Sequence, residues 1–322
     1  MGRSLRLVAL AAGLGVLLTV PPALPAFWLR VLTGIWLWAA LSQSWNIIGG
    51  YTGYLNFGHG AFFGIGAYVT ALGMNELGLP FAATLPLGGL LTTLLAAAIG
   101  IPTLRLRGPY FAIATWAFGE MVKQVALVLE FTGGPHGIQV DSPLNDTLVY
   151  YITFGAFLLT MAVTWWLLER APFGQKLQAI RENEMAAESL GIDTTRVKLQ
   201  AFALSAFFPG VLGGIYTYWI TFIHPQSVLD VSVTDQMVVM VLLGGLGTYW
   251  GPVLGAGILW LLNRVIWAYW GESVFYLVLL GLAVCAVVLY LPDGIVGLFE
   301  GRRGGRWREN ARYLLRRLGV GA

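Results

Sequence analysis

The sequence predicts an all-α, polytopic integral membrane protein with about 8–10 transmembrane helices and a cytoplasmic coupling helix in one polar loop. Hydrophobic residues make up 57% of the 322 residues and charged residues only 11%, whereas soluble domains carry about 25% charged residues. Long apolar runs recur along the chain, and they do not alternate as the strands of a membrane barrel do. The composition therefore excludes a soluble enzyme, a disordered protein and a nucleic-acid binder.

About ten segments are long and apolar enough to be spans, since a membrane helix needs roughly 20 apolar residues. They are 5–28, 31–48, 60–78, 81–101, 109–129, 147–168, 200–223, 234–248, 252–270 and 273–291. The eighth is short and leads into a glycine-rich boundary, so counts of 8, 9 and 10 stay open if one segment is re-entrant. We divide the chain into a membrane domain, 1–300, which contains the polar loop 169–199, and a basic tail, 301–322.

Basic residues orient the chain, because Lys and Arg near span ends favour the cytoplasmic side. With a cytoplasmic N-terminus and an even number of spans, the cytoplasmic segments hold Arg3, Arg6, Arg105, Arg107, Arg170, Lys176, Arg181, Arg196, Lys198 and the arginines of the tail. Both termini are then cytoplasmic. The first 26 residues also resemble a signal peptide, and its removal would leave the tail inside. We favour a retained span, since Trp28 and Arg30 suit an interfacial anchor.

The polar loop 169–199 predicts a short helix outside the bilayer. Leu177, Ile180, Ala187 and Leu190 recur with a helical period and would share one face. Gly191 is a natural stop for this helix, and Asp193 or Thr194 can cap the helix that enters the next span. One interpretation is a solvated connector. The other is a docking helix for a cytosolic partner, favoured by an alanine patch beside mixed charges.

Residues 173–206, FGQKLQAIRENEMAAESLGIDTTRVKLQAFALSA, resemble the cytoplasmic loop of permeases from branched-chain amino acid ABC transporters. Ala186, Ala187 and Gly191 match the importer pattern E-A-A, three residues, Gly. Met185 stands where the glutamate of that pattern would be, and Glu184 lies one place earlier. By this resemblance the residues that dock an ATPase are Arg181, Glu184, Ala186, Ala187, Glu188 and Gly191.

Four further stretches resemble the same family in the same order. They are LSQSWNIIGGYTGYLNFGHGAFFGIGAY at 41–68, LRLRGPYFAIATWAFGEMV at 104–122, TGGPHGI at 132–138 and LLGGLGTYWGPVLGA at 242–256. The resemblance implies a permease domain that forms part of a path for leucine, isoleucine and valine in a bacterial or archaeal inner membrane. It also implies a second homologous permease, two ABC ATPases and an extracytoplasmic binding protein. A urea or short-amide permease of the same family stays open.

The chain has no ATP-binding motif of its own. A P-loop needs lysine directly after glycine, whereas Lys123, Lys176 and Lys198 follow valine, glutamine and valine. We therefore predict a transport subunit that is not an enzyme and holds no cofactor, with ATP and magnesium bound by partner subunits. A secondary carrier is less favoured, because such carriers bury ionisable groups in their spans. An intramembrane hydrolase lacks its nucleophile motifs here, and the scattered histidines and single Cys285 predict no metal site.

Glycine is dense in two segments of opposite halves, 49–66 and 244–257. Paired interrupted helices point to a transport site, whereas Gly60-x-x-x-Gly64 and Gly251-x-x-x-Gly255 are close-packing motifs, and both interpretations stay open. Polar residues that could line a path are Asn46, Tyr51, Asn56, His59, Thr115, Glu120 and Gln124. For His59 a packing role is favoured. A mid-membrane charge costs about 2.5–3.5 kcal/mol, so Glu120 should face protein or water, or pair with Lys123. The tail is predicted to lie on the inner lipid surface.

Overall fold

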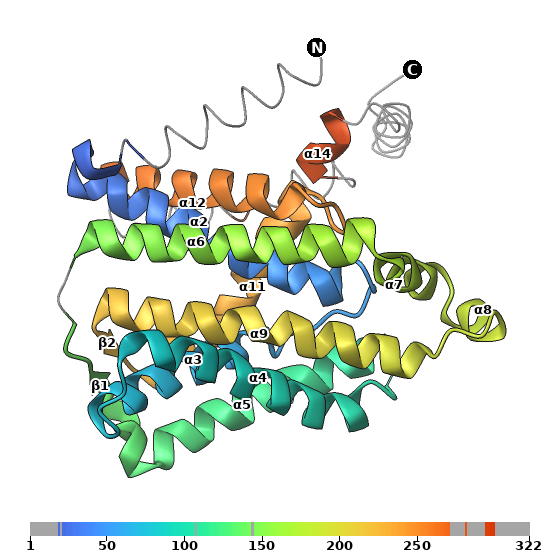
Figure 1. Cartoon of the computed structure of the whole chain (residues 1–322), viewed down its shortest axis with the longest axis horizontal. Helices are drawn as coiled ribbons and strands as arrows, with labels where there is room; N and C mark the ends of the chain where they lie inside the picture. The colour runs from blue at the N-terminus through green and yellow to red at the C-terminus, as the bar shows by residue number, and fades with distance from the viewer. Residues whose placement is uncertain are drawn as a thin grey trace, which may run out of the picture.

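The structure is a computed structural model that describes residues 19, 21–106, 108–142, 145–270, 281 and 294–299. Most of these residues are helical and only two short strands are present among them, which confirms an all-α polytopic membrane protein (Figure 1). The tenth predicted span, 273–291, the basic tail 301–322 and most of the first span lie outside the described residues. The span count and the position of the tail therefore stay predictions.

The elements follow in chain order. They are η1 (Pro21–Ala23), α2 (Ala26–Gly49), α3 (His59–Asn75), α4 (Phe81–Thr103), α5 (Pro109–Val128), η2 (Glu130–Thr132), η3 (Gly134–His136), β1 (Ile138–Gln139), α6 (Asp146–Thr164), the π-helical turn η4 (Trp165–Arg170), α7 (Pro172–Glu182), α8 (Glu184–Ser189), α9 (Thr194–Ile220), β2 (Phe222–Ile223), α10 (Pro225–Val228), α11 (Val231–Gly244), α12 (Gly251–Trp270) and α14 (Gly294–Phe299). Among the described residues, five helical segments are long and apolar enough to cross a membrane: Phe81–Thr103, Pro109–Val128, Asp146–Arg170, Thr194–Ile220 and Pro225–Gly244.

The centre of the bundle is a close contact of α9 with α3 and α4. A Cβ added at Gly66 of α3 would overlap the carbonyl oxygen of Gly210 on α9, and one added at Gly213 would overlap the carbonyl of Phe63. These glycines let the helix backbones touch, which is the usual way that membrane helices associate. Of the five long segments, α9 is the most buried and α5 the least.

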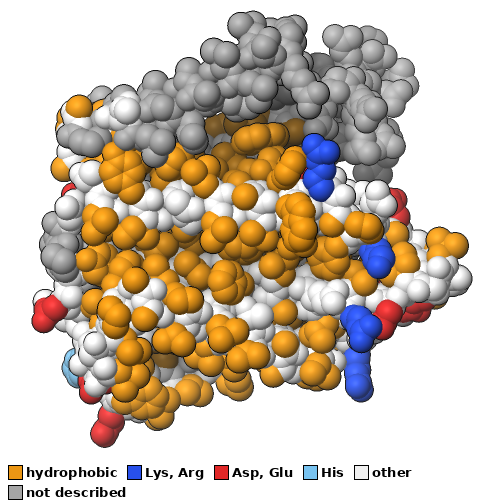
Figure 2. All heavy atoms as spheres, in the orientation of Figure 1, with side chains coloured by type: hydrophobic (Ala, Val, Ile, Leu, Met, Phe, Trp, Pro, Cys, Tyr) orange, Lys and Arg blue, Asp and Glu red, His pale blue; other side chains and the backbone are white. Residues whose placement is uncertain are grey.

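The two ends of the bundle differ. At one end β1 pairs with β2 through Ile138 and Ile223; at the other, α7 and α8 project beyond the long helices (Figure 1). Figure 2 shows hydrophobic side chains over the middle of the visible face and charged side chains gathered at these two ends. This is the distribution that a bilayer around the middle of the bundle requires.

Several helix boundaries differ from the predicted spans. The predicted first span ran through residue 28, but α2 begins at Ala26, because Pro25 precedes it in an extended conformation. The eighth was predicted at 234–248, whereas α11 covers Val231–Gly244 and ends at Gly245, whose φ is 134°. The seventh begins at Thr194 rather than 200, so α9 extends continuously into the polar loop.

Candidate functional site

The polar loop contains two helices rather than the single predicted one. The chain breaks between α7 and α8 at Asn183, whose backbone is extended (φ −161°, ψ 106°) and whose side-chain oxygen accepts a hydrogen bond from the N–H of Ala186. Of the four residues predicted to share one face, Leu177, Ile180 and Ala187 are buried, but Leu190 is 81% exposed. The predicted shared face was wrong for Leu190, because α8 restarts in a new direction after Asn183 and ends at Ser189.

The junction between α8 and α9 is short and fully capped. Gly191 has a left-handed φ of 84°. Its N–H donates to the backbone carbonyl of Glu188 at 2.9 Å, and the N–H of Ile192 donates to the backbone carbonyl of Ala187 at 3.1 Å. These two hydrogen bonds form a Schellman motif. The Asp193 carboxylate then accepts from the N–H of Arg196 at 3.0 Å and caps α9. The predicted stop at Gly191 is confirmed, and Asp193 rather than Thr194 is the cap.

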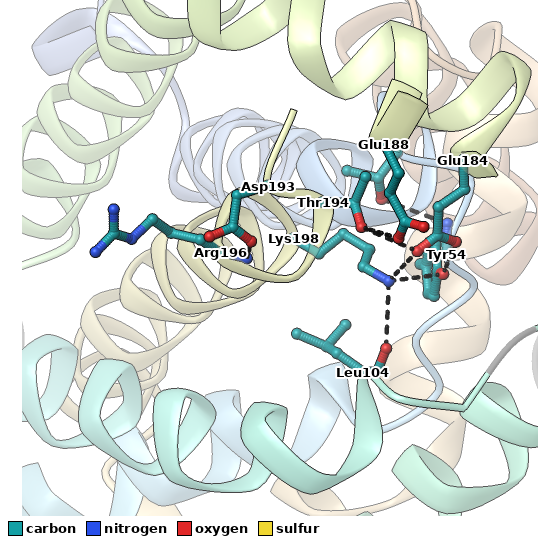
Figure 3. Close-up of polar contacts among 9 residues, drawn as sticks. Tyr54, Leu104, Glu184, Glu188, Asp193, Thr194, Arg196 and Lys198 are labelled. Atoms are coloured by element: carbon teal, nitrogen blue, oxygen red, sulfur yellow. Dashed lines mark hydrogen bonds and ion pairs between the residues drawn. The ribbon is translucent and has the colours of Figure 1, made fainter. Parts of the chain in front are cut away.

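Four segments of the chain meet at Lys198, near the start of α9 (Figure 3). Its ammonium forms an ion pair with Glu184 of α8 and donates to the Tyr54 hydroxyl at 3.0 Å and to the Leu104 carbonyl at 3.3 Å. The Tyr54 hydroxyl in turn donates to Glu184 at 2.5 Å. We call Tyr54, Glu184, Lys198 and the Leu104 carbonyl the Lys198 cluster. It joins α8 and α9 to the end of α4 and to the non-helical segment 51–58.

The Lys198 cluster was not predicted from the sequence. Lys198 is only 3% exposed and Glu184 15%, so this is a buried ion pair whose lone pairs and protons are satisfied by neighbours. The available indication was that Lys198 shares a helix face with the apolar Ala201 and Phe202.

The predicted docking residues fall on two sides of the loop. Arg181 and Glu184 point inward: Arg181 donates to the Gly50 carbonyl at 2.6 Å, and Glu184 belongs to the Lys198 cluster. Ala187 is buried as well. The outward side carries Met185, Ala186, Glu188, Leu190 and Gly191, all exposed. Glu188 also accepts a hydrogen bond from Thr194 at 2.7 Å, which fixes the carboxylate at the edge of this surface.

The structure brings the two glycine-rich segments together, since a Cβ added at Gly50 would overlap the backbone nitrogen of Gly247. The Asn46 side chain donates to the Thr248 carbonyl at 2.9 Å and accepts from the Gly247 N–H at 2.9 Å. The contact lies beside Arg181, at the α7 end of the bundle. The first segment contains the irregular, non-helical stretch 51–58, whereas the second is the turn 245–250 between α11 and α12.

Close packing accounts for several of these glycines. A Cβ at Gly64 would overlap the Leu229 side chain, and one at Gly255 would overlap the Met240 carbonyl. The packing interpretation therefore holds for these positions, and a role of the segments in transport stays a prediction.

Five of the predicted path residues are buried and hydrogen-bonded within the chain. Besides Asn46, the Tyr51 hydroxyl donates to Glu169 at 2.8 Å, and burial together with this carboxylate raises the pKa of Tyr51. Ring nitrogens of His59 lie 3.1 Å from the Ser44 hydroxyl and 3.2 Å from the Asn56 amide. Thr115 accepts from the Phe57 N–H at 3.1 Å. These bonds hold 51–58 in place against α2 and α5.

Glu120 and Gln124 are different, because they lie on the outer side of α5. Glu120 pairs with Lys123 at 2.7 Å and accepts from the Gln124 amide at 2.8 Å. Lys123 also approaches Asp230 at 3.5 Å. The structure thus contains the Glu120–Lys123 pair that the sequence offered as one interpretation. Within the described residues no group of three or more His, Cys, Asp and Glu side chains could hold a metal ion.

Comparison with known proteins identifies relatives along most of the chain. The family described as the branched-chain amino acid transport system / permease component matches residues 27–288. The chain is 31% identical over 297 residues to the high-affinity branched-chain amino acid transport system permease protein LivM of Salmonella typhimurium, covering 83% of this chain and 69% of that one. It is 25% identical to the probable LivM of Methanocaldococcus jannaschii, covering 83% and 92% of the two chains.

The chain is also similar to permeases that are named for other substrates. The chain is 32% identical over 221 residues to the autoinducer 2 import system permease protein LsrC of Salmonella choleraesuis, covering 63% of this chain and 60% of that one. No solved structure matches.

Proposed function

Because this chain belongs to the family of branched-chain amino acid transport system permease components, as the match over residues 27–288 shows, we propose that it is a membrane-spanning subunit of an ATP-driven importer for leucine, isoleucine and valine. In this proposal it works with a second homologous permease, two ABC ATPases and an extracytoplasmic binding protein. It lies in a bacterial or archaeal inner membrane, with α8 and both termini in the cytoplasm.

The observation that carries the proposal is the two-sided structure of α8. Its outward side presents Met185, Ala186 and Leu190 to a partner, and 63% of Met185 is exposed. Its inward side is held by the Lys198 cluster and by the capped junction at Gly191. A helix that is exposed on one side and bound firmly to the bundle on the other can transmit a movement of its partner.

The path of transmission follows from the contacts. When the two ATPases close on ATP, their movement shifts α8. The Glu184–Lys198 pair carries the shift into α9, and the hydrogen bonds of Tyr54 carry it into 51–58. Arg181 adds a second connection, through Gly50, to the turn at Gly247. Switching requires two packings that the partners stabilise differently.

The distribution of charge supports a cytoplasmic α8. Arg105 follows α4 at the end where Leu104 meets Lys198, and Arg170 and Lys176 flank the start of α7. Glu130 follows α5 at the opposite end. Basic residues on the α8 side satisfy the positive-inside rule.

The test is uptake by purified subunits in proteoliposomes. The chain would be reconstituted with its partner permease, both ATPases and the binding protein, and uptake of labelled leucine would be measured with ATP, without ATP, and with the chain alone. We expect uptake only in the complete system with ATP. Uptake by the chain alone would show a secondary carrier and contradict the proposal.

The same vesicles distinguish the substrate alternatives. Leucine, isoleucine and valine should compete with one another, whereas urea and acetamide should not. ATP-dependent uptake of urea or acetamide without uptake of leucine would keep the importer mechanism and replace the substrate by that of the alternative permease.

A further inference from the structure

The outward face of α5 is unusual for a helix that crosses a membrane. Of the five long segments α5 is the least buried, with 17% of its most apolar window buried against 61% for α9. Its other side packs through Phe111, Thr115 and Ala126, which are buried. The middle of the exposed side is formed by Ala117, Glu120 and Gln124, at positions i, i+3 and i+7.

Polar groups therefore lie in the middle of a surface that is otherwise apolar. Glu120 is the twelfth of the 20 residues of α5, which places it near the centre of the bilayer. Its carboxylate contacts Lys123 and Gln124, and side chains of all three reach the surface in part. Acyl chains offer these groups no hydrogen bond, so protein or water must cover the face.

A groove beside this face extends the surface to two further segments. It has a volume of about 380 Å³ and is lined by Phe57, Ala112, Ile113, Trp116, Val231 and Asp235. These residues come from 51–58, α5 and the start of α11. Since Tyr54 of the same stretch belongs to the Lys198 cluster, a shift of 51–58 would change the groove directly.

The charges on this surface are unbalanced. Glu120, Asp230 and Asp235 supply three carboxyl groups, and Lys123 supplies one ammonium group. Packing this face against the same face of a second copy would bring carboxyl groups together away from water, which is unfavourable. A partner with basic or hydrogen-bond-donating side chains at mid-membrane depth complements it.

We propose that the exposed face of α5, with the adjacent groove, is the surface on which a second, non-identical permease chain packs, and that Glu120 and Gln124 face that chain. This inference rests on the proposed function for the existence of the second permease. It adds which surface meets that permease, and that its complement carries basic or hydrogen-bond-donating groups.

The test measures whether lipid reaches the face in the assembled complex. In a Cys285→Ser background, bimane would be attached to Ala117→Cys on α5 or to Leu94→Cys, an exposed position on α4 that serves as the control. The chain would be reconstituted into vesicles containing lipids brominated in the middle of their acyl chains, alone or with the partner permease. We expect quenching at both positions in the chain alone, loss of most of the quenching at residue 117 in the complex, and no loss at residue 94.

Two results would overturn the inference. Equal quenching at residue 117 with and without the partner permease would show that the face stays in lipid. Protection of residue 117 in the chain alone would show that a second copy covers it. Co-purification of the ATPases, measured on the same samples, tests the proposed function separately: ATPases bound with residue 117 still quenched would leave the importer intact and remove only this surface.

Discussion

The inward and outward sides of α8 can be compared residue by residue. Glu184 is partly buried in the Lys198 cluster and Ala187 is fully buried, whereas Met185 and Ala186 are exposed, as is Leu190 just beyond the helix. Neighbouring positions of one short helix thus have different physical roles. Substitutions on the inward side should change the stability of the bundle. Substitutions of the exposed side chains of Met185, Ala186 and Leu190 should change only the interaction with a partner.

The largest loss of stability is expected for Lys198→Met. The substitution leaves the Glu184 carboxylate buried without its cation, and breaking a buried ion pair in this way costs about 3–5 kcal/mol. Thermal unfolding of the purified chain in detergent should show a clearly lower midpoint. Arg196→Met is the matched control, because Arg196 lies two residues away on the exposed side of α9; a midpoint lowered equally in both variants would contradict the role of the cluster.

A smaller loss of stability is expected for Tyr54→Phe. The variant removes the hydroxyl that donates to Glu184 and accepts from Lys198, and a hydrogen bond to a charged group contributes about 1.5–3 kcal/mol. The ratio of leucine transported to ATP hydrolysed should also fall, since the link to 51–58 is weakened. Tyr110→Phe, at a position that is 70% exposed, should change neither quantity. An unchanged transport ratio for Tyr54→Phe would limit the hydroxyl to a structural role.

The features of this region that the sequence predicted depend on residues close together in the chain. The features that it did not predict depend on contacts between residues far apart in the chain. The stop at Gly191 and the cap at Asp193 depend on residues within one turn of a helix, so residue type and spacing indicate them. Lys198, by contrast, meets Tyr54 across 144 positions and Leu104 across 94. No periodicity within a single chain carries that information.

The glycine-rich segments illustrate the same limit. Their composition indicated that the backbone departs from a regular helix in both, and the structure confirms this at 51–58 and 245–250. The composition could not distinguish a longer irregular stretch from a short turn, because glycine is tolerated in both. Nor could it indicate that Asn46 would bond to the second segment, since that contact depends on how α2 packs against α11 and α12.

Gly191→Ala should lower the stability of the chain modestly. The left-handed φ of 84° strains any residue with a Cβ, and the cost is about 1 kcal/mol. Because nothing lies within 4 Å of an added Cβ at this position, the loss reflects the backbone alone. Gly155→Ala in α6 also has free space around it but lacks a positive φ, so its unfolding midpoint should not fall. Equal midpoints for the two variants would show that the junction tolerates another conformation.

The smallest effect on stability, with the clearest effect on transport, is expected for Ala186→Glu. Exposed substitutions usually change stability by less than about 0.5 kcal/mol, so the variant should insert and unfold like the parent chain. A new carboxylate in the middle of the outward side of α8 should nevertheless prevent the ATPases from docking and abolish ATP-driven leucine uptake.

Gln175→Glu places the same charge on the exposed side of α7 and should keep uptake. Ala187→Glu, one residue along, should instead reduce the amount of folded protein, because Ala187 is buried. Normal uptake by Ala186→Glu would assign docking to another surface and leave α8 with only its inward contacts.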